Sequence, residues 1–347
     1  MNDISLDLVS LLKSNMNTKT GIVENFKEMI YKTGLETVCK VALERRMGFL
    51  DSTDKIDTHE ILDAIHLYQK ASTDSMYGLP FWKYLPAKVS TCARNLMNSK
   101  DFLFHTFSQI IDETIDLDDS EGANPDSILS ALLNVKEVEK KDVKASVVDY
   151  ITAGMDTIGN SMIFLVANLA MNEDVQDKLH EEIDRVFPNK CDITPELLCE
   201  VPYMKACVTE SFRMFPTASQ IARITEHDMT LSTGHELPKG SVVLCHHRIA
   251  ALQEENFSRA TEFLPERWVQ PRNKTMFEKH SPSLVLPFGS GKRICPGKRL
   301  AEQELNIITA KLFQNFRVEL LTPTLELEFN YLLTPAGSVS LKLIERD

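Results

Sequence analysis

Apolar residues recur at helical spacing through the first two thirds of the chain. In the segment 23–49 they follow the three- and four-residue steps of a helix face. These positions are Phe26, Met29, Ile30, Leu35, Val38, Val41 and Ala42. Similar patterns predict helices over residues 61–76, 90–115, 141–171, 172–186 and 203–215. From residue 150 to 171 the pattern is apolar on nearly every side, which is typical of a helix through the middle of a large fold.

The pattern changes after Pro216, which ends the last of these helices. Short β-like runs follow at residues 229–231 and 241–245, separated by Gly, Pro and Asp turns. One more helix is predicted over 296–313, and strands are predicted around 317–320 and 339–343. Residues 77–86 carry two prolines and a glycine, which predict a loop. The whole pattern predicts a mainly α protein with small β-sheets, organised as one domain over residues 1–347.

Composition narrows the function classes. The formal net charge of −12 argues against nucleic acid as a partner, because phosphate binding requires an excess of Lys and Arg. The seven cysteines form no C-x-x-C pair, so a zinc site or a small disulfide framework is not expected. Their odd number favours a reducing compartment. The first residues resemble neither a signal peptide nor a mitochondrial presequence, and no apolar stretch reaches the roughly 20 residues that span a bilayer.

The strongest chemical signal is the segment Pro-Phe-Gly-Ser-Gly-Lys-Arg-Ile-Cys-Pro-Gly at 287–297. Gly289, Gly291 and Gly297 allow the backbone to pass close to a flat ligand. Cys295 stands just before a predicted helix, where backbone N–H groups stabilise a thiolate over a thiol. A lone cysteine is usually a buried structural thiol. The glycines and Arg293 around this one favour a functional role.

The order Phe, Gly, basic residue, Cys, Gly in this segment resembles the haem-binding loop of cytochromes P450. The resemblance implies the cytochrome P450 fold and heme b (iron protoporphyrin IX) as cofactor, with Cys295 as the axial thiolate. It also implies that Arg293 pairs with a haem propionate and that Phe288 packs beside the sulfur. Gly289 and Gly297 belong to the same loop. A thiolate ligand favours O–O cleavage, which a monooxygenase requires.

Two further sets of residues resemble the same family. Glu210 and Arg213 are three positions apart on one predicted helix, where their side chains meet. Such a pair is often only a solvated contact. Arg267, in Pro-Glu-Arg-Trp, follows in the order that the family uses, and the resemblance implies a buried structural triad of these three residues. Arg223, in Ile-Ala-Arg-Ile, is similar to a second propionate ligand.

The segment Ala-Gly-Met-Asp-Thr at 153–157 lies inside the apolar central helix. An Asp beside a Thr is costly to bury there without a purpose. One interpretation is a helix kink, because Thr can hydrogen-bond to its own preceding turn. The resemblance implies the oxygen-activating groove of the family. In that groove Gly154 leaves room for dioxygen, Thr157 holds the iron-bound oxygen, and Asp156 helps to deliver protons.

Basic residues around the cysteine loop interrupt the acidic trend of the chain. Lys292, Lys298 and Arg299 flank Cys295, and Lys205 lies on the helix of Glu210. Each is plausible as an ordinary solvated side chain, but together they predict a positive patch for an acidic partner. Three segments resemble the mitochondrial branch of animal P450s: Cys-Pro-Gly-Lys-Arg-Leu-Ala-Glu, Pro-Phe-Trp-Lys-Tyr-Leu-Pro and Leu-Glu-Arg-Arg-Met-Gly-Phe-Leu. That branch implies electrons from a [2Fe-2S] ferredoxin with its NADPH-dependent reductase, and a matrix-side location at the mitochondrial inner membrane.

The pocket is expected to be apolar and to suit a lipophilic substrate, sterol-like or xenobiotic. Residues 61–86, 150–157 and 217–220 are expected to line or roof it. The apolar and aromatic residues of the loop predict either a peripheral membrane contact or a loop packed over the core. These residues are Leu79, Phe81, Trp82 and Tyr84.

Relative to the family pattern, we expect the chain to lack the N-terminal anchor or presequence, the first sheet and the propionate-binding helix. Two functions therefore remain open: a ferredoxin-dependent monooxygenase, or a truncated chain that is non-catalytic or retains haem poorly. An isomerase that needs no electrons is disfavoured by the Asp156–Thr157 pair.

Overall fold

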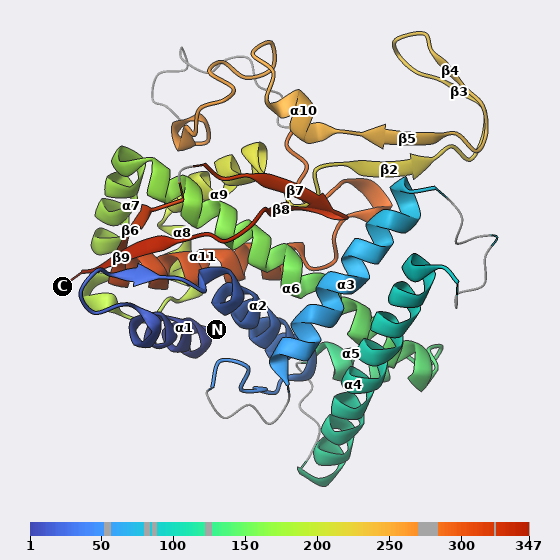
Figure 1. Ribbon diagram of the computed structural model, residues 1–347, viewed down its shortest axis with the longest axis horizontal. Helices are drawn as coiled ribbons and strands as arrows, with labels where there is room; N and C mark the ends of the chain where they lie inside the picture. Colours follow the sequence, from blue (N-terminus) through green and yellow to red (C-terminus); the bar gives the residue numbers. More distant parts are fainter. Residues whose placement is uncertain are drawn as a thin grey trace.

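The long helix α6 (Lys140–Met171) runs through the centre of the computed structural model, as the apolar pattern predicts (Figure 1). The structure describes residues 1–347 apart from 52–56, 80–83, 85–88, 122–126, 270–283, 323 and 347. Helix α2 (Phe26–Leu43) packs along α6. Between Ile158 and Ala170 every residue of α6 is buried, because neighbouring elements cover the helix on all sides.

Four more helices surround this pair on the N-terminal side. α1 (Asn2–Asn15) packs on α2, and α5 (Ile128–Leu133) contacts both α2 and α6. α3 (Thr58–Tyr77) and α4 (Thr91–Glu121) lie side by side (Figure 1). Helix α3 begins where it does because Asp57 caps it: the Asp57 carboxylate accepts a hydrogen bond from the Glu60 N–H at 3.1 Å.

The C-terminal half adds shorter helices. They are α7 (Glu173–Val186), α8 (Pro195–Cys199), α9 (Pro202–Met214), α10 (His247–Ala251) and α11 (Lys298–Asn315), with 3-10 turns at Pro188–Lys190, Pro265–Arg267 and Gly291–Arg293. The buried Glu182 of α7 fixes the start of α9, because its carboxylate accepts the N–H groups of Tyr203 at 3.0 Å and Met204 at 2.8 Å.

The strands form small antiparallel sheets. β9 (Leu341–Glu345) lies between β1 (Ile22–Val23) and β6 (Phe316–Leu320), which joins the two ends of the chain. β2 (Ile221–Ile224) pairs with β5 (Val242–Cys245), and Arg223 stands opposite Val243. β3 (Met229–Thr230) pairs with β4 (Glu236–Leu237), and β7 (Leu327–Asn330) pairs with β8 (Leu332–Pro335).

The prediction of a mainly α fold with small β-sheets is confirmed, with 59% of the described residues in helices. The first predicted helix is wrong at its C-terminal end, because α2 stops at Leu43 and Glu44 takes a left-handed φ of 55°. Glu36 causes this stop: its buried carboxylate accepts the N–H groups of Met47 at 3.0 Å and Phe49 at 2.9 Å. The returning chain therefore wraps around α2 instead of extending it.

Helices α1, α5, α8 and α10 were not predicted. The apolar residues Ile4, Leu8 and Leu12 of α1 are all buried and four positions apart, so the helical pattern was present in the sequence. Among the described residues, no helix combines the length and the apolar character needed to cross a bilayer.

Candidate functional site

The cysteine loop leads directly into α11. Its tight path requires glycine at two positions, since Gly289 and Gly291 both have a φ of +74°. The Cys295 N–H donates to the Phe288 carbonyl at 2.9 Å, which closes the loop. The thiol of Cys295 is half-buried just before the first turn of α11, where the helix dipole favours a negative charge.

Aromatic packing holds this loop against α9. The Phe288 ring lies 5.3 Å from the ring of Phe212 in an edge-on arrangement. The Lys298 ammonium lies 5.9 Å from the centre of the Phe288 ring. Helix α6 also approaches the loop, because a Cβ placed on Gly297 would lie 3.9 Å from the Tyr150 hydroxyl and 3.8 Å from the Cys295 sulfur. Burial raises the pKa of Tyr150 to about 12, and the nearby Glu304 and Cys295 add to the shift.

Two arginines flank the same loop. Arg223 on β2 is exposed, and its guanidinium donates to the Ala222 carbonyl at 2.8 Å. Strand β2 lies against the loop, because the Ile221 side chain would be 3.9 Å from a Cβ on Gly289. Arg293 is exposed at the end of a 3-10 turn. Within the part of the chain that the structure describes, neither arginine pairs with a carboxylate.

The middle of α6 carries the segment that the sequence singled out. Ala153 is exposed and Thr157 is half-buried, whereas every residue from Ile158 to Ala170 is buried. The Thr157 hydroxyl donates to the carbonyls of Ala153 at 2.8 Å and Gly154 at 3.1 Å, as a hydroxyl bonded to its own turn does. Its predicted role toward iron-bound oxygen stays a prediction.

Gly154 faces helix α2. A Cβ at this position would lie 2.7 Å from the Cγ2 of Val38, so the missing side chain lets α2 and α6 approach closely. Sequence reasoning assigned this space to dioxygen. In the structure it accommodates a neighbouring helix, and the role toward dioxygen stays a prediction.

The Asp156 side chain points toward α3. Its carboxylate, 1% exposed, accepts a hydrogen bond from the Gln69 amide, and its Oδ1 lies 3.3 Å from the Nε2 of His66. Sequence reasoning missed His66 and Gln69. Their spacing of three residues places them on one face of α3, which is the signal that could have drawn attention to them.

The residues predicted to form a triad lie together in the core. Glu210 is fully buried. Its two oxygens accept hydrogen bonds from Nε and Nη2 of Arg213, each at 2.9 Å, and from Nε of Arg267 at 3.0 Å. The indole N–H of Trp268 donates to the same carboxylate at 2.9 Å, and so does the Leu264 N–H. Every lone-pair direction of this buried carboxylate is therefore in use. Trp268 was missed as a member of this cluster.

The basic residues near the loop have different surroundings. Lys205, Lys292 and Arg299 are exposed on α9, the 3-10 turn and α11. Lys298 is 3.9 Å from Glu302 on the next turn, so part of its charge is compensated. Their role in docking a partner stays a prediction.

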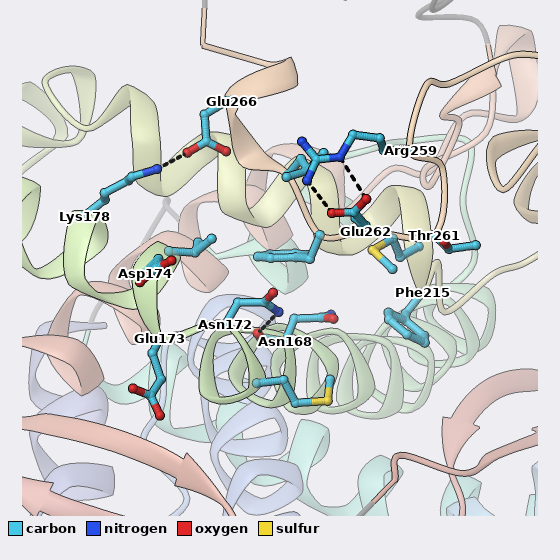
Figure 2. A pocket seen from close by; sticks show the side chains of 15 residues that line it. Asn168, Asn172, Glu173, Asp174, Lys178, Phe215, Arg259, Thr261, Glu262 and Glu266 are labelled. Carbon is cyan, nitrogen blue, oxygen red and sulfur yellow. Dashed lines mark hydrogen bonds and ion pairs between the residues drawn. The ribbon is translucent and has the colours of Figure 1, made fainter. Parts of the chain in front are cut away.

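One cavity lies away from these groups. It has a volume of about 940 Å³ and lies where the end of α6, the start of α7 and residues 259–266 meet, as Figure 2 shows. Two ion pairs lie among its lining residues, with Lys178 2.6 Å from Glu266 and Arg259 2.5 Å from Glu262. Its nearest α6 residue, Asn168, is eleven positions beyond Thr157, or about 16 Å along the helix. We therefore do not assign the chemistry to this cavity.

A second cavity, of about 230 Å³, lies between α3, α4 and α6. Two of its lining residues, Tyr68 and Thr152, lie in segments that the sequence predicts to line the substrate pocket. The lining is mainly apolar, with a lysine and an aspartate. It consists of Tyr68, Lys100, Leu103, Phe104, Ala145, Val148, Asp149 and Thr152.

Comparison with known proteins decides the family. The family model described as Cytochrome P450 matches residues 1–343. The chain belongs to the cytochrome P450 family. The family implies a haem with a cysteine thiolate ligand. The resemblance seen in the cysteine loop is thereby confirmed at the level of the family.

Relatives include proteins with mitochondrial names. The chain is 35% identical, over its whole length, to ecdysone 20-monooxygenase of Drosophila melanogaster and covers 65% of that protein. It is 31% identical over 92% of its length to probable cytochrome P450 12a5, mitochondrial, of the same species, covering 61% of it. It is 29% identical over its whole length to cytochrome P450 27C1 of Danio rerio, covering 65%. The chain thus spans less than two thirds of the length of these relatives.

The donor groups of this P450 fit a haem. One half-buried thiol is available for iron at a glycine-rich turn, and the guanidinium groups of Arg223 and Arg293 have no acidic partner among the described residues. Propionates are the kind of carboxylate that unpaired arginines bind. The arrangement can hold an anionic, flat, iron-containing cofactor.

Proposed function

We propose that this P450 is a haem-thiolate monooxygenase that inserts one oxygen atom from O₂ into a lipophilic substrate. The observation that carries the proposal is the half-buried Cys295 at the start of α11, in a glycine turn that α6 approaches through Tyr150. The relative named ecdysone 20-monooxygenase supports the reaction class.

In this proposal Cys295 ligates the haem iron, and Arg223 and Arg293 bind the propionates. Bound haem supplies the activation of O₂. The chain supplies the surroundings: Ala153 presents only a methyl group on the exposed face of α6, and the Thr157 Oγ1 is the polar group next to it. The apolar faces of α6 limit the access of water. Asp156, adjacent in sequence, holds the proton to be delivered.

The electrons come from a [2Fe-2S] ferredoxin and its NADPH-dependent reductase. The exposed side chains of Lys205, Lys292 and Arg299, together with the partly compensated Lys298, give the acidic chain a basic face beside the cysteine loop. Opposite charges steer association without deciding affinity alone. The mitochondrial names of several relatives support the same partner and a matrix-side location at the inner membrane.

The substrate is sterol-like or a xenobiotic of similar character. The cavity between α3, α4 and α6 supports an apolar ligand with a few polar contacts. Peripheral membrane contact would use the segment after α3. Leu79 and Tyr84 are exposed there, whereas Phe81 and Trp82 lie outside the described residues.

Reconstitution with haem, ferredoxin, reductase and NADPH under ¹⁸O₂ tests the proposal. A sterol panel should yield a product with one labelled oxygen atom, and Cys295→Ser should yield none. Lys239→Glu, a charge reversal on an exposed turn, serves as the surface control and should retain turnover. Haem-loaded protein that ferredoxin reduces but that gives no labelled product would contradict the proposal.

A further inference from the structure

A titratable side chain of α3, His66, lies between the buried carboxylate of Asp156 and solvent. We propose that His66 takes protons from solvent and passes them to Asp156, which makes it a proton-transfer residue of the oxygenation reaction. This inference rests on the proposed monooxygenase function. It assigns a role to a residue that the haem loop, the triad and the Asp156–Thr157 pair do not include.

The geometry places His66 between water and Asp156. Its Nε2 lies 3.3 Å from the Asp156 Oδ1, whereas its side chain is 45% exposed. The ring of Tyr31 backs the imidazole edge-on, with the ring centres 5.1 Å apart. One nitrogen of the imidazole thus lies at the buried carboxylate, and the ring is exposed enough to contact water.

The other partners of Asp156 do not supply protons. Gln69, which donates its amide to the carboxylate, has no titratable proton. The Tyr31 hydroxyl donates to the Asn160 side chain at 2.7 Å. Burial, followed by the charge of Asp156, raises the pKa of Tyr31, so its proton is held tightly at physiological pH.

Charged groups on three helices surround His66. Asp156 faces it from α6, Lys27 from α2 and Asp63 from its own helix. Burial alone lowers the pKa of His66, but the hydrogen bond and charge of Asp156 outweigh burial, and the pKa is raised overall. Lys27 opposes this effect and Asp63 adds to it. The imidazolium is thereby kept available at a higher pH than for a free histidine.

The proton balance is simple. The imidazolium of His66 releases the proton on Nε2 to the Asp156 carboxylate, which gives neutral imidazole and a carboxylic acid. With haem bound, the Asp156 carboxylic acid would release that proton into the water molecule that monooxygenation forms from O₂, and Asp156 would return to the carboxylate. His66 recovers a proton from water on its exposed side. No oxidant or reductant takes part in this transfer.

The first test follows the imidazole signals of the full 347-residue chain by NMR as pH is varied. The His66 resonance should titrate above a free histidine, and Asp156→Asn should lower its midpoint. His59, on the same helix and 65% exposed beside Glu28, is the matched control and should not respond. An unchanged His66 midpoint in Asp156→Asn would overturn the contact on which the inference depends.

The second test is kinetic. His66→Gln should lower kcat by about a hundredfold, the lower end of general acid–base effects, with little change in KM. The rate of the wild type should fall as pH rises through the His66 midpoint, and His66→Gln should lack this limb. His59→Gln should behave as wild type. An unchanged pH profile in His66→Gln would overturn the inference. A haem-loaded wild type without product would instead overturn the monooxygenase proposal and remove the reaction that this residue serves.

Discussion

Tyr31 occupies the space that a side chain at Gly159 would need. A Cβ at Gly159 would lie 2.6 Å from the Cε1 of the Tyr31 ring, closer than real Cβ atoms come to other groups. The same tyrosine donates its hydroxyl to Asn160, one residue further along α6. This pair sets how closely α2 and α6 approach at the level of Asp156.

Gly159→Ala should therefore destabilise the fold. The added methyl group forces the buried Tyr31 ring to move, and overpacking of this kind costs about 1–3 kcal/mol. Urea unfolding should show a lower midpoint with an unchanged slope. Ser146→Ala, at an exposed position on the same helix, is the control and should leave the midpoint nearly unchanged. Equal midpoints for the two variants would show that α2 and α6 are not packed as described.

Glu210→Gln should be among the most disruptive substitutions in the chain. The carboxylate compensates two buried guanidinium groups, of Arg213 and Arg267, and removing its charge leaves them uncompensated. Breaking a buried pair costs about 3–5 kcal/mol. The measurement is the free energy of unfolding. Glu262→Gln is the control because its partner Arg259 is on the surface, and a similar loss in both variants would contradict the central role of Glu210.

His180 should make the fold acid-sensitive. Burial, followed by the charge of Arg346, lowers its pKa from 6.5 to about 4. The pKa of His180 is lower in the folded state than in the unfolded state, so the stability that the neutral imidazole contributes is fully present above pH 6.5. This stability is lost as pH falls toward 4, by at most about 3 kcal/mol. His180→Gln should unfold with a weaker dependence on pH in this window. If the free energy of unfolding changed equally with pH in the wild type and in His180→Gln, the lowered pKa of His180 would be contradicted.

Charge reversal beside the cysteine loop should slow electron delivery. Lys292→Glu with Arg299→Glu should reduce the rate of ferredoxin-dependent reduction by roughly tenfold at low salt, because steering by opposite charges is lost. The difference should shrink as salt screens the charges. Lys239→Glu, far along the chain from the loop, is the control. A salt-independent rate in all three proteins would contradict docking at this face.

The sequence predicted the long elements because their signals are local. The helical period identified α6 and α4, and the glycines around Cys295 identified the loop without any tertiary information. The end of α2 could not be predicted in this way. It depends on Glu36 accepting the N–H groups of residues more than ten positions later, which is a long-range contact.

The candidate site was predictable in part for the same reason. Glu210 and Arg213 are three residues apart on one helix, so a contact between them could be expected from spacing alone. The contact of Asp156 with His66 joins residues ninety positions apart on two helices, and no periodicity indicates it. The direction of the Asp156 side chain is set by how α3 packs on its neighbours.

The ferrous carbon-monoxide spectrum of the purified chain after haem supplementation tests thiolate ligation by Cys295 most directly. The wild type should show the red-shifted Soret band of thiolate ligation. Cys295→Ser should lack that band, and Cys199→Ser, which changes an exposed cysteine on α8, should keep it. The same band in Cys295→Ser, or no haem uptake by the wild type, would contradict the account.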